Sequence, residues 1–265
     1  MRAMKIKVLG TILLSCMITM SYAQKKVMLD NFYNNEISSK TGKPFHYIWE
    51  DTALSGFSEL GDLFKLRGAT LSTLKEKPNK VNLKGSSVYI IVDPDTKLET
   101  ANPNYMDKVA ANAIADWVKK GGVLVMFTND GKNCELDSFN ILAAKFGMKF
   151  NNVLLHPEIK AEPGMPRNYN SCASINLPNH PLFKGVAKIF LKEVSSISCV
   201  KPANAVLQEG EDILMAQAKY GKGYVFAVGD PWLYNEYIDH AHLTADFENL
   251  KAANNLVDWL LTKKK

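Results

Sequence analysis

Four short apolar segments of this chain each end at an acidic or amide residue. Unbroken runs of β-branched and aliphatic residues are typical of buried parallel strands, and open α/β sheets bind ligands beyond the carboxyl ends of such strands. The pattern therefore predicts a polar site at one sheet edge, although Asp and Asn also occur there as ordinary turn residues. The segments, with the polar residues that follow, are Val27–Leu29 with Asp30 and Asn31, Val88–Val92 with Asp93, Val123–Phe127 with Asn129 and Asp130, and Tyr224–Val228 with Asp230.

Apolar positions at helical spacing alternate with these strand segments in the first half of the chain. Such alternation favours parallel strands joined by crossover helices. One helix is expected to begin at Asn104, a candidate N-cap, and to end at the glycines 121 and 122. A second is expected from Glu135 to Lys145, with Gly147 at its C-terminus, and a third closes the chain from about Ala245.

The second half of the chain predicts three successive strands, Ala205–Leu207, Ile213–Ala218 and Tyr224–Val228, with a hairpin turn at 220–223 before the last. The stretch from His156 to Pro181 is rich in Pro and Asn. It is interpreted as a surface excursion, because no independent core pattern is visible in it. Residues 24–265 are therefore expected to form a single α/β domain, a mostly parallel sheet with helices on both faces.

The first 23 residues have the pattern of a secretory signal peptide. Basic residues precede the apolar run Val8–Met20, and Ser21-Tyr22-Ala23 supplies a small-residue cleavage site. The apolar run is shorter than the roughly 20 residues that a spanning helix needs. We expect a periplasmic or secreted protein that begins at Gln24. A lipoprotein processed at Cys16 is the alternative, but it would keep the apolar segment that follows.

Charge and cysteine content restrict the possible partners. Removing the leader with Arg2, Lys5 and Lys7 lowers the formal net charge from +5 to +2. Nucleic-acid binding needs Lys and Arg gathered on one face, so no nucleic-acid partner is predicted, and the terminal lysines are interpreted as a solvated tail. No cysteine after the leader has metal-ligand spacing. A disulfide between Cys172 and Cys199, and three buried free thiols that include Cys134, both stay open.

A segment after the first strand is the densest cluster of polar and aromatic residues. A short connection would suffice there, so its length indicates a function. Tyr47 and Trp49 can stack on sugar rings, while His46, Glu50 and Asp51 can bind hydroxyls or act as acid and base. Alternatively, the aromatic residues fill the core and the two acids begin a helix.

Polar residues also follow the next two strands of the pattern. Asp93 and Asp95 could share a cation through oxygen ligands, or could simply form a turn. Asn129 and Asp130 stand where class I glutamine amidotransferases and α/β-hydrolases carry a glycine-flanked nucleophile. The flanking glycines are missing here and Cys134 comes several residues later, so Cys134 is not expected to be a nucleophile.

A second cluster of acids and aromatic residues follows the last strand. Its content matches that of the first cluster, and both are expected at the same sheet edge. His240 and His242 come close behind, but without a third ligand in register they are expected at the surface or in hydrogen bonds. The candidate residues of this cluster are Asp230, Trp232, Tyr234, Asn235 and Glu236.

Several motifs of the chain together resemble one domain family. They are His46–Asp51, Gly56-Phe57-Ser58, Val92–Thr96 with Glu99, Asn102–Tyr105, Asn129-Asp130 and Gly229–Trp232. With these motifs the chain resembles the glutamine-amidotransferase-like domain of unknown function at the C-terminal side of unsaturated rhamnogalacturonyl hydrolases. The resemblance covers nearly all of residues 24–265. More distantly, the chain is similar to trehalose-utilisation-type domains, which lack a nucleophilic cysteine.

The resemblance implies a flavodoxin-like, class I glutamine amidotransferase-like fold and a role in the breakdown of rhamnogalacturonan or pectin. Hydrolases of that family carry a separate (α/α) barrel with their catalytic Asp, for which this chain has no room, so the activity does not follow from the likeness. Two versions stay open: a sugar hydrolase without a catalytic cysteine, and a carbohydrate-binding protein that serves a partner glycoside hydrolase. A scaffold that only contacts other proteins ranks last, because it would leave the strand-end carboxylates without a purpose. No cofactor or metal is predicted.

The candidate residues are the same in both versions. The predicted catalytic residues are His46, Glu50, Asp51, Asp93, Asp130 and Asp230, and the predicted substrate-binding residues are Tyr47, Trp49, Asp95, Asn129, Trp232, Tyr234, Asn235 and Glu236.

Overall fold

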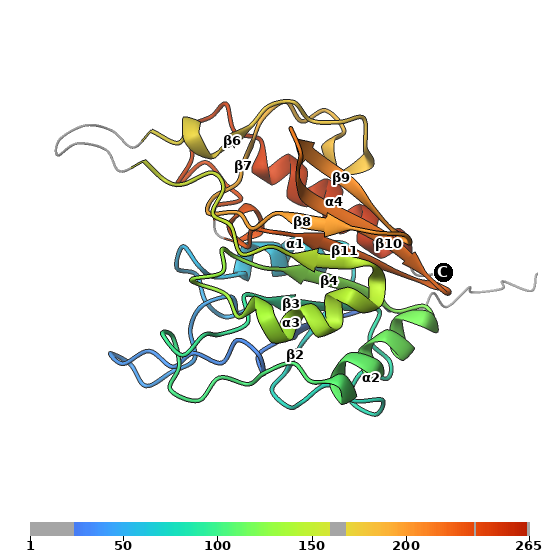
Figure 1. Cartoon of the computed structure of the whole chain (residues 1–265). Coiled ribbons are helices and arrows are strands. Elements are labelled where there is room, and N and C mark those ends of the chain that lie inside the picture. The colour runs from blue at the N-terminus through green and yellow to red at the C-terminus, as the bar shows by residue number, and fades with distance from the viewer. Residues whose placement is uncertain (1–23, 160–167, 236, 264–265) are drawn as a thin grey trace, which may run out of the picture.

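The computed structural model describes residues 24–159, 168–235 and 237–263 (Figure 1). The leader predicted at 1–23 and the candidate residue Glu236 lie outside the described residues. Within the described part of the chain, no helix is both long and apolar enough to cross a membrane.

A seven-stranded sheet forms the centre of the fold. In spatial order its strands are β2 (Thr70–Leu74), β1 (Lys26–Asp30), β3 (Val88–Val92), β4 (Val123–Phe127), β11 (Gly223–Val228), β10 (Asp212–Tyr220) and β9 (Ala203–Glu209). The first five are parallel to one another, and β10 and β9 continue the sheet antiparallel. The predicted α/β class and mostly parallel sheet are confirmed.

Helices cover both faces of this sheet (Figure 1). One face packs against α1 (Ser58–Leu66) and α4 (Asn249–Lys263), and the other against α2 (Lys108–Lys119) and α3 (Leu136–Ala143). Successive side chains of β3 alternate between these two cores, because strand residues point to opposite faces. β3 and β4 are fully buried because helices cover both of their faces, and this explains their unbroken apolar sequences.

Shorter elements lie outside the main sheet. The strand β5 (Met148–Phe150) pairs antiparallel with β8 (Ile197–Cys199), and β6 (Ala173–Ser174) pairs antiparallel with β7 (Ile189–Phe190). The stretch rich in Pro and Asn contributes β6 to the second pair. Single 3-10 turns are η1 (Ala144–Phe146), η2 (Asn170–Cys172), η3 (Pro181–Phe183) and η4 (Trp232–Tyr234).

Two helix ends differ from the predictions. Asp107, not Asn104, caps α2, because its side chain accepts a hydrogen bond from the Ala110 N–H at 2.8 Å. Asn104 instead donates to the Phe32 carbonyl across the fold. The second helix ends in the 3-10 turn η1, and Gly147 follows it in the left-handed conformation as predicted, with φ of 79°.

The closing helix begins at Asn249 rather than near Ala245. Tertiary contacts hold the preceding residues in a turn: Phe247 packs against Phe190 in a separate aromatic cluster, and the Glu248 N–H donates to the Lys188 carbonyl at 2.8 Å. Leu250, an apolar residue in the first turn of this helix, is 43% exposed. Helical periodicity alone could not identify these competing contacts.

Candidate functional site

The strand-end acids gather at one edge of the sheet, as the parallel pattern predicts. Asp30 ends β1, and Asp93, Asp130 and Asp230 follow shortly after β3, β4 and β11, four strands that run in the same direction. All four are buried, with at most 5% of their surface exposed. Burial of carboxyl groups disfavours their charged form unless partners compensate. The partners of each acid therefore decide its role.

Asp93 has a strained backbone and an incomplete set of partners. Its φ of 42° lies in the left-handed region. The Tyr47 hydroxyl and the Asn129 amide both bond to its side chain, but Oδ1 is buried without a partner. Burial first, and then the Glu99 carboxylate, raise the pKa of Asp93 well above its ordinary value. Asp93 is therefore held by side chains from distant segments and not only by its own turn.

Asp95 and Asp30 are tied to the loop that follows β1. Asp95 Oδ2 accepts from the Asn35 N–H at 2.8 Å, while Oδ1 has no partner. Burial first, and then the Glu36 and Glu99 carboxylates, together raise the pKa of Asp95 to about 7. The pKa of Asp30 is raised to about 6, again by burial, although the Tyr89 hydroxyl donates to it at 2.5 Å.

No cation site is built from these acids. Among the residues that the structure describes, no three His, Cys, Asp or Glu side chains are grouped so that they could hold a metal ion. The side chains of Asp93 and Asp95 accept hydrogen bonds from Asn129 and Asn35, which are far away in the sequence, so a turn held by these two side chains does not describe the pair either.

His46 lies in a strained loop and pairs with an acid that the sequence analysis missed. Its Nδ1 is 2.7 Å from Glu36 Oε1, and the His46 side chain is 35% exposed. The loop is held by Asp51, which accepts from the backbone N–H groups of His46 and Ala53. Asp51 therefore stabilises the loop and does not begin a helix, since α1 begins only at Ser58.

The loop after β11 is anchored by Asp230. This fully buried carboxylate accepts from the Lys192 N–H at 2.9 Å and from the Trp232 N–H at 2.6 Å. Burial raises the pKa of Asp230 to about 7. The Lys192 ammonium lies 4.3 Å from the centre of the Trp232 ring and 3.1 Å from Glu158. Asp230 thus positions Trp232 and Lys192 rather than facing a ligand itself.

The two predicted loops meet in one pocket. This pocket, of about 500 Å³, is lined by His46 and the segment 53–55 from the first loop and by Trp232 and Tyr237 from the second. Glu158 and Lys192 complete its wall. The expectation that both clusters lie at the same sheet edge agrees with this arrangement. Its charged groups Glu158 and Lys192 are partly buried, and the sequence patterns indicated neither, because neither follows a strand of the predicted pattern.

Other candidates lie away from this pocket. Trp49 is buried, donates to the Ser72 carbonyl at 3.1 Å and packs against Phe64, so the core alternative describes it and the stacking role does not. Tyr234 is fully buried against Phe127. Glu50 faces a separate hollow that Lys43 and others line.

Two further candidates are buried at the edge itself. Asp130 accepts from Lys132 and Asn133 within its own turn, which agrees with the turn interpretation. Asn235 accepts from the Tyr237 N–H at 2.9 Å, and its amide nitrogen is buried without a partner. Both residues therefore hold turns at this edge of the sheet.

Backbone strain concentrates around the pocket. The non-glycine residues with positive φ in the described chain are His46, Tyr47, Asp93, His156 and Glu193. Each lies in a segment that contributes a lining residue or its direct support. Conformations of this kind cost about 1–3 kcal/mol each and are typical of functional sites.

Comparisons with known proteins support the fold only. No family model matches the sequence, and no curated protein is significantly similar to it. The N-terminal domain of mmIFT52 is similar in structure, with a TM-score of 0.65, 16% identity, and coverage of 90% of this chain and 98% of that chain. Exo-β-1,4-mannosidase Op5Man5 from Opitutaceae bacterium strain TAV5 has a TM-score of 0.52 and 13% identity, over 90% of this chain and 36% of the mannosidase.

The structural neighbours also include a ThuA-like protein from Bacteroides uniformis, with a TM-score of 0.48, 15% identity, and coverage of 92% of this chain and 95% of that chain. None of these three neighbours is named as a rhamnogalacturonyl hydrolase. The link to those hydrolases therefore stays a sequence-based prediction.

The cysteines among the described residues, Cys134, Cys172 and Cys199, are free, so the Cys172–Cys199 disulfide is not formed. Burial raises the pKa of Cys134 well above its ordinary value, and Asp93 adds to this effect. Burial likewise raises the pKa of Cys172 to about 11, whereas Cys199 is only half-buried. Neither buried thiol is activated as a thiolate.

We expect a thiol reagent at pH 8 to label Cys199 first and Cys134 only after unfolding, because reagent access and thiolate formation are both suppressed by burial. Mass spectrometry of digested protein at successive times measures the order. Cys134→Ser is expected to leave ligand affinity unchanged. Labelling of Cys134 in the folded protein as fast as that of Cys199 would contradict this assignment.

Proposed function

We propose that the chain is an exported carbohydrate-binding protein of the flavodoxin-like, amidotransferase-like class. The order of its five parallel strands, β2-β1-β3-β4-β11, is the order of flavodoxin-like sheets. In such sheets ligands bind where the strand order reverses, here between β1 and β3. The loop after β1, which carries His46, begins at this point.

One observation carries the proposal: His46 and Trp232, which are far apart in the sequence, line the same pocket. Trp232 supplies an aromatic surface beside it, and Lys192 and Glu158 supply hydrogen-bonding groups of both charges. An apolar ring face combined with a few fixed polar groups is the usual composition of a site for a sugar. The mannosidase, a carbohydrate enzyme by name, contains a similar fold within a longer chain.

Binding is better supported than turnover. The predicted acids Asp93, Asp130 and Asp230 are buried and accept hydrogen bonds from protein donors, and none of them lines the pocket. In the enzymatic version, a proton on His46 Nδ1 is held by Glu36, which leaves Nε2 as the general base. The catalytic role of His46 therefore depends on Glu36 and not on an acid across the sheet edge.

We expect Trp232→Ala to weaken sugar binding by about tenfold, through the loss of stacking area. Calorimetry against a panel of rhamnogalacturonan- and pectin-derived oligosaccharides measures the affinity. Tyr105→Ala is the matched control, because Tyr105 is an exposed aromatic residue (46%) that does not line the pocket. Equal affinity of the Trp232 variant and wild type would place the sugar elsewhere.

A scaffold role is the alternative. If no sugar of the panel binds, while the chain co-elutes with a rhamnogalacturonyl hydrolase in size-exclusion chromatography, the accessory function is supported instead. The rhamnogalacturonan preference rests on the sequence resemblance, and the panel tests it directly.

A further inference from the structure

A second region with exposed lysines lies at the opposite, amino-terminal edge of the sheet. Two adjoining hollows, of about 380 and 560 Å³, share Lys120 and Gly121. Six lysines from separate segments line them, although the sequence analysis expected no such gathering of basic residues. They come from the approach to β3, the end of α2, the β10–β11 hairpin and the end of α4: Lys80, Lys84, Lys120, Lys219, Lys222 and Lys263.

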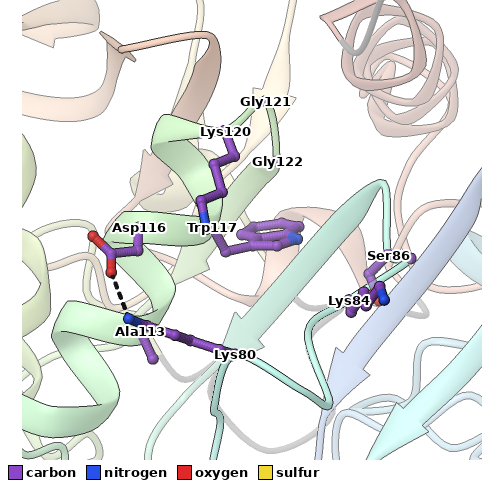
Figure 2. A pocket seen from close by; sticks show the side chains of 10 residues that line it. Lys80, Lys84, Ser86, Ala113, Asp116, Trp117, Lys120, Gly121 and Gly122 are labelled. Atoms are coloured by element: carbon purple, nitrogen blue, oxygen red, sulfur yellow. Dashed lines mark ion pairs between the residues drawn. The ribbon is translucent and has the colours of Figure 1, made fainter.

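Most of this positive charge is not neutralised by the protein. Among the described residues, Lys80 is the one of the six that forms an ion pair, with Asp116 at 3.3 Å. Figure 2 shows this pair at one side of the first hollow and Lys84 at the other. Lys84, Lys120, Lys219 and Lys222 are exposed. Like charges brought together without a counter-charge repel one another, so an anionic ligand would stabilise the cluster.

Close packing fixes the shape of this region. A Cβ on Gly122 would lie 2.4 Å from the Trp117 ring, so the glycine lets the half-buried indole lie against the turn (Figure 2). A Cβ on Gly223 would lie 2.0 Å from the Val118 carbonyl, which brings the hairpin against the end of α2. The Lys263 ammonium is held 4.7 Å from the ring centres of Tyr224 and Trp259. The lysines therefore border a preformed groove with an aromatic surface.

We infer that this groove binds a chain of carboxylated sugars, with the carboxylates on the lysines and a sugar ring against Trp117. The inference does not depend on the pocket at the opposite edge. A concave groove does not fit a flat membrane surface. A nucleic acid is less well matched, because the groove contains no arginine, the residue best suited to phosphate, and because the net charge of residues 24–265 is only +2.

The test uses a galacturonic acid hexamer, with its fully methyl-esterified form as the uncharged probe. We expect the double variant Lys120→Gln/Lys222→Gln to weaken binding of the acidic hexamer by about tenfold or more at low salt, because exposed charges act additively and are screened by salt. The control Lys149→Gln/Lys184→Gln removes the same charge from exposed lysines outside the groove and should change the affinity less than about twofold.

These outcomes differ from the outcomes expected for the pocket that His46 and Trp232 line. The esterified hexamer should not bind the groove, and Trp232→Ala should leave unchanged the salt-sensitive binding of the acidic hexamer that Lys120→Gln/Lys222→Gln weakens. The inference is overturned if wild type does not bind the acidic hexamer or if the groove variant binds it as well as wild type does. It is also overturned if a single-stranded oligonucleotide or an anionic phosphatidylserine vesicle binds more tightly at the same salt.

Discussion

Gly229→Ala is expected to lower the free energy of unfolding by about 3 kcal/mol or more, because no space exists for the added methyl group. Gly229 follows β11, where its carbonyl accepts from the Ser195 N–H at 2.9 Å. A Cβ at this position would lie 1.7 Å from the Ser195 carbonyl oxygen, a backbone atom that cannot move aside alone. The segment that carries Lys192 over the pocket would be displaced, and its bond to Asp230 would be lost.

Urea denaturation followed by circular dichroism measures this effect. Gly210→Ala is the matched control, because Gly210 has a positive φ of 58° but no atom within 4 Å of its added Cβ. That substitution should cost only about 1 kcal/mol, from backbone conformation. A Gly229 variant no less stable than the Gly210 variant would show that the close approach to Ser195 is not required.

Asp95→Asn is expected to stabilise the protein at pH 8 by about 2 kcal/mol or more and to change little near pH 4.5. The pKa of Asp95 is raised from 3.8 to about 7 by burial and by nearby carboxylates. Between these values the folded protein keeps a proton that the unfolded chain releases. The free energy of unfolding therefore falls as pH rises through this window, and Asn, which cannot ionise, removes that fall.

The free energy of unfolding is measured for Asp95→Asn and for wild type from pH 4 to pH 8, and the difference between the two curves is the result. The difference is used because Asp30 and Asp230 also have raised pKa values and affect both curves alike. The amide oxygen of Asn can still accept from the Asn35 N–H. Asp62→Asn, at an exposed ion pair, is the control and should leave the curve nearly unchanged. Parallel curves for Asp95→Asn and wild type would show that Asp95 is ionised throughout this range.

The site could be predicted from sequence in part. The apolar strands and the acids that follow them placed Asp93 and Asp230 at one edge, because parallel strands end on the same side. Glu36 and Lys192 could not be found in this way. Glu36 lies in an irregular loop, where no periodic pattern marks it. Lys192 lies in a short segment that reaches the pocket because the neighbouring Ser195 packs against Gly229.

Residue type alone also could not separate core from surface. Trp49 and Trp232 occur in similar acidic and aromatic clusters, yet the first donates to a strand carbonyl in the core and the second lines the pocket. The same holds for the lysines: Lys84, Lys120 and Lys222 are ordinary surface residues in the sequence and become one groove after folding.

The sequence by itself determined the α/β class, the four central parallel strands and the edge at which their polar ends meet, because hydrophobic periodicity reports burial and strand direction follows from the crossover helices. The tertiary structure decided which acids are buried with a raised pKa, which tryptophan lines the pocket, and where lysines gather. These properties depend on contacts between segments far apart in the chain, such as the bond from Lys192 to Asp230, and local sequence patterns carry no record of them.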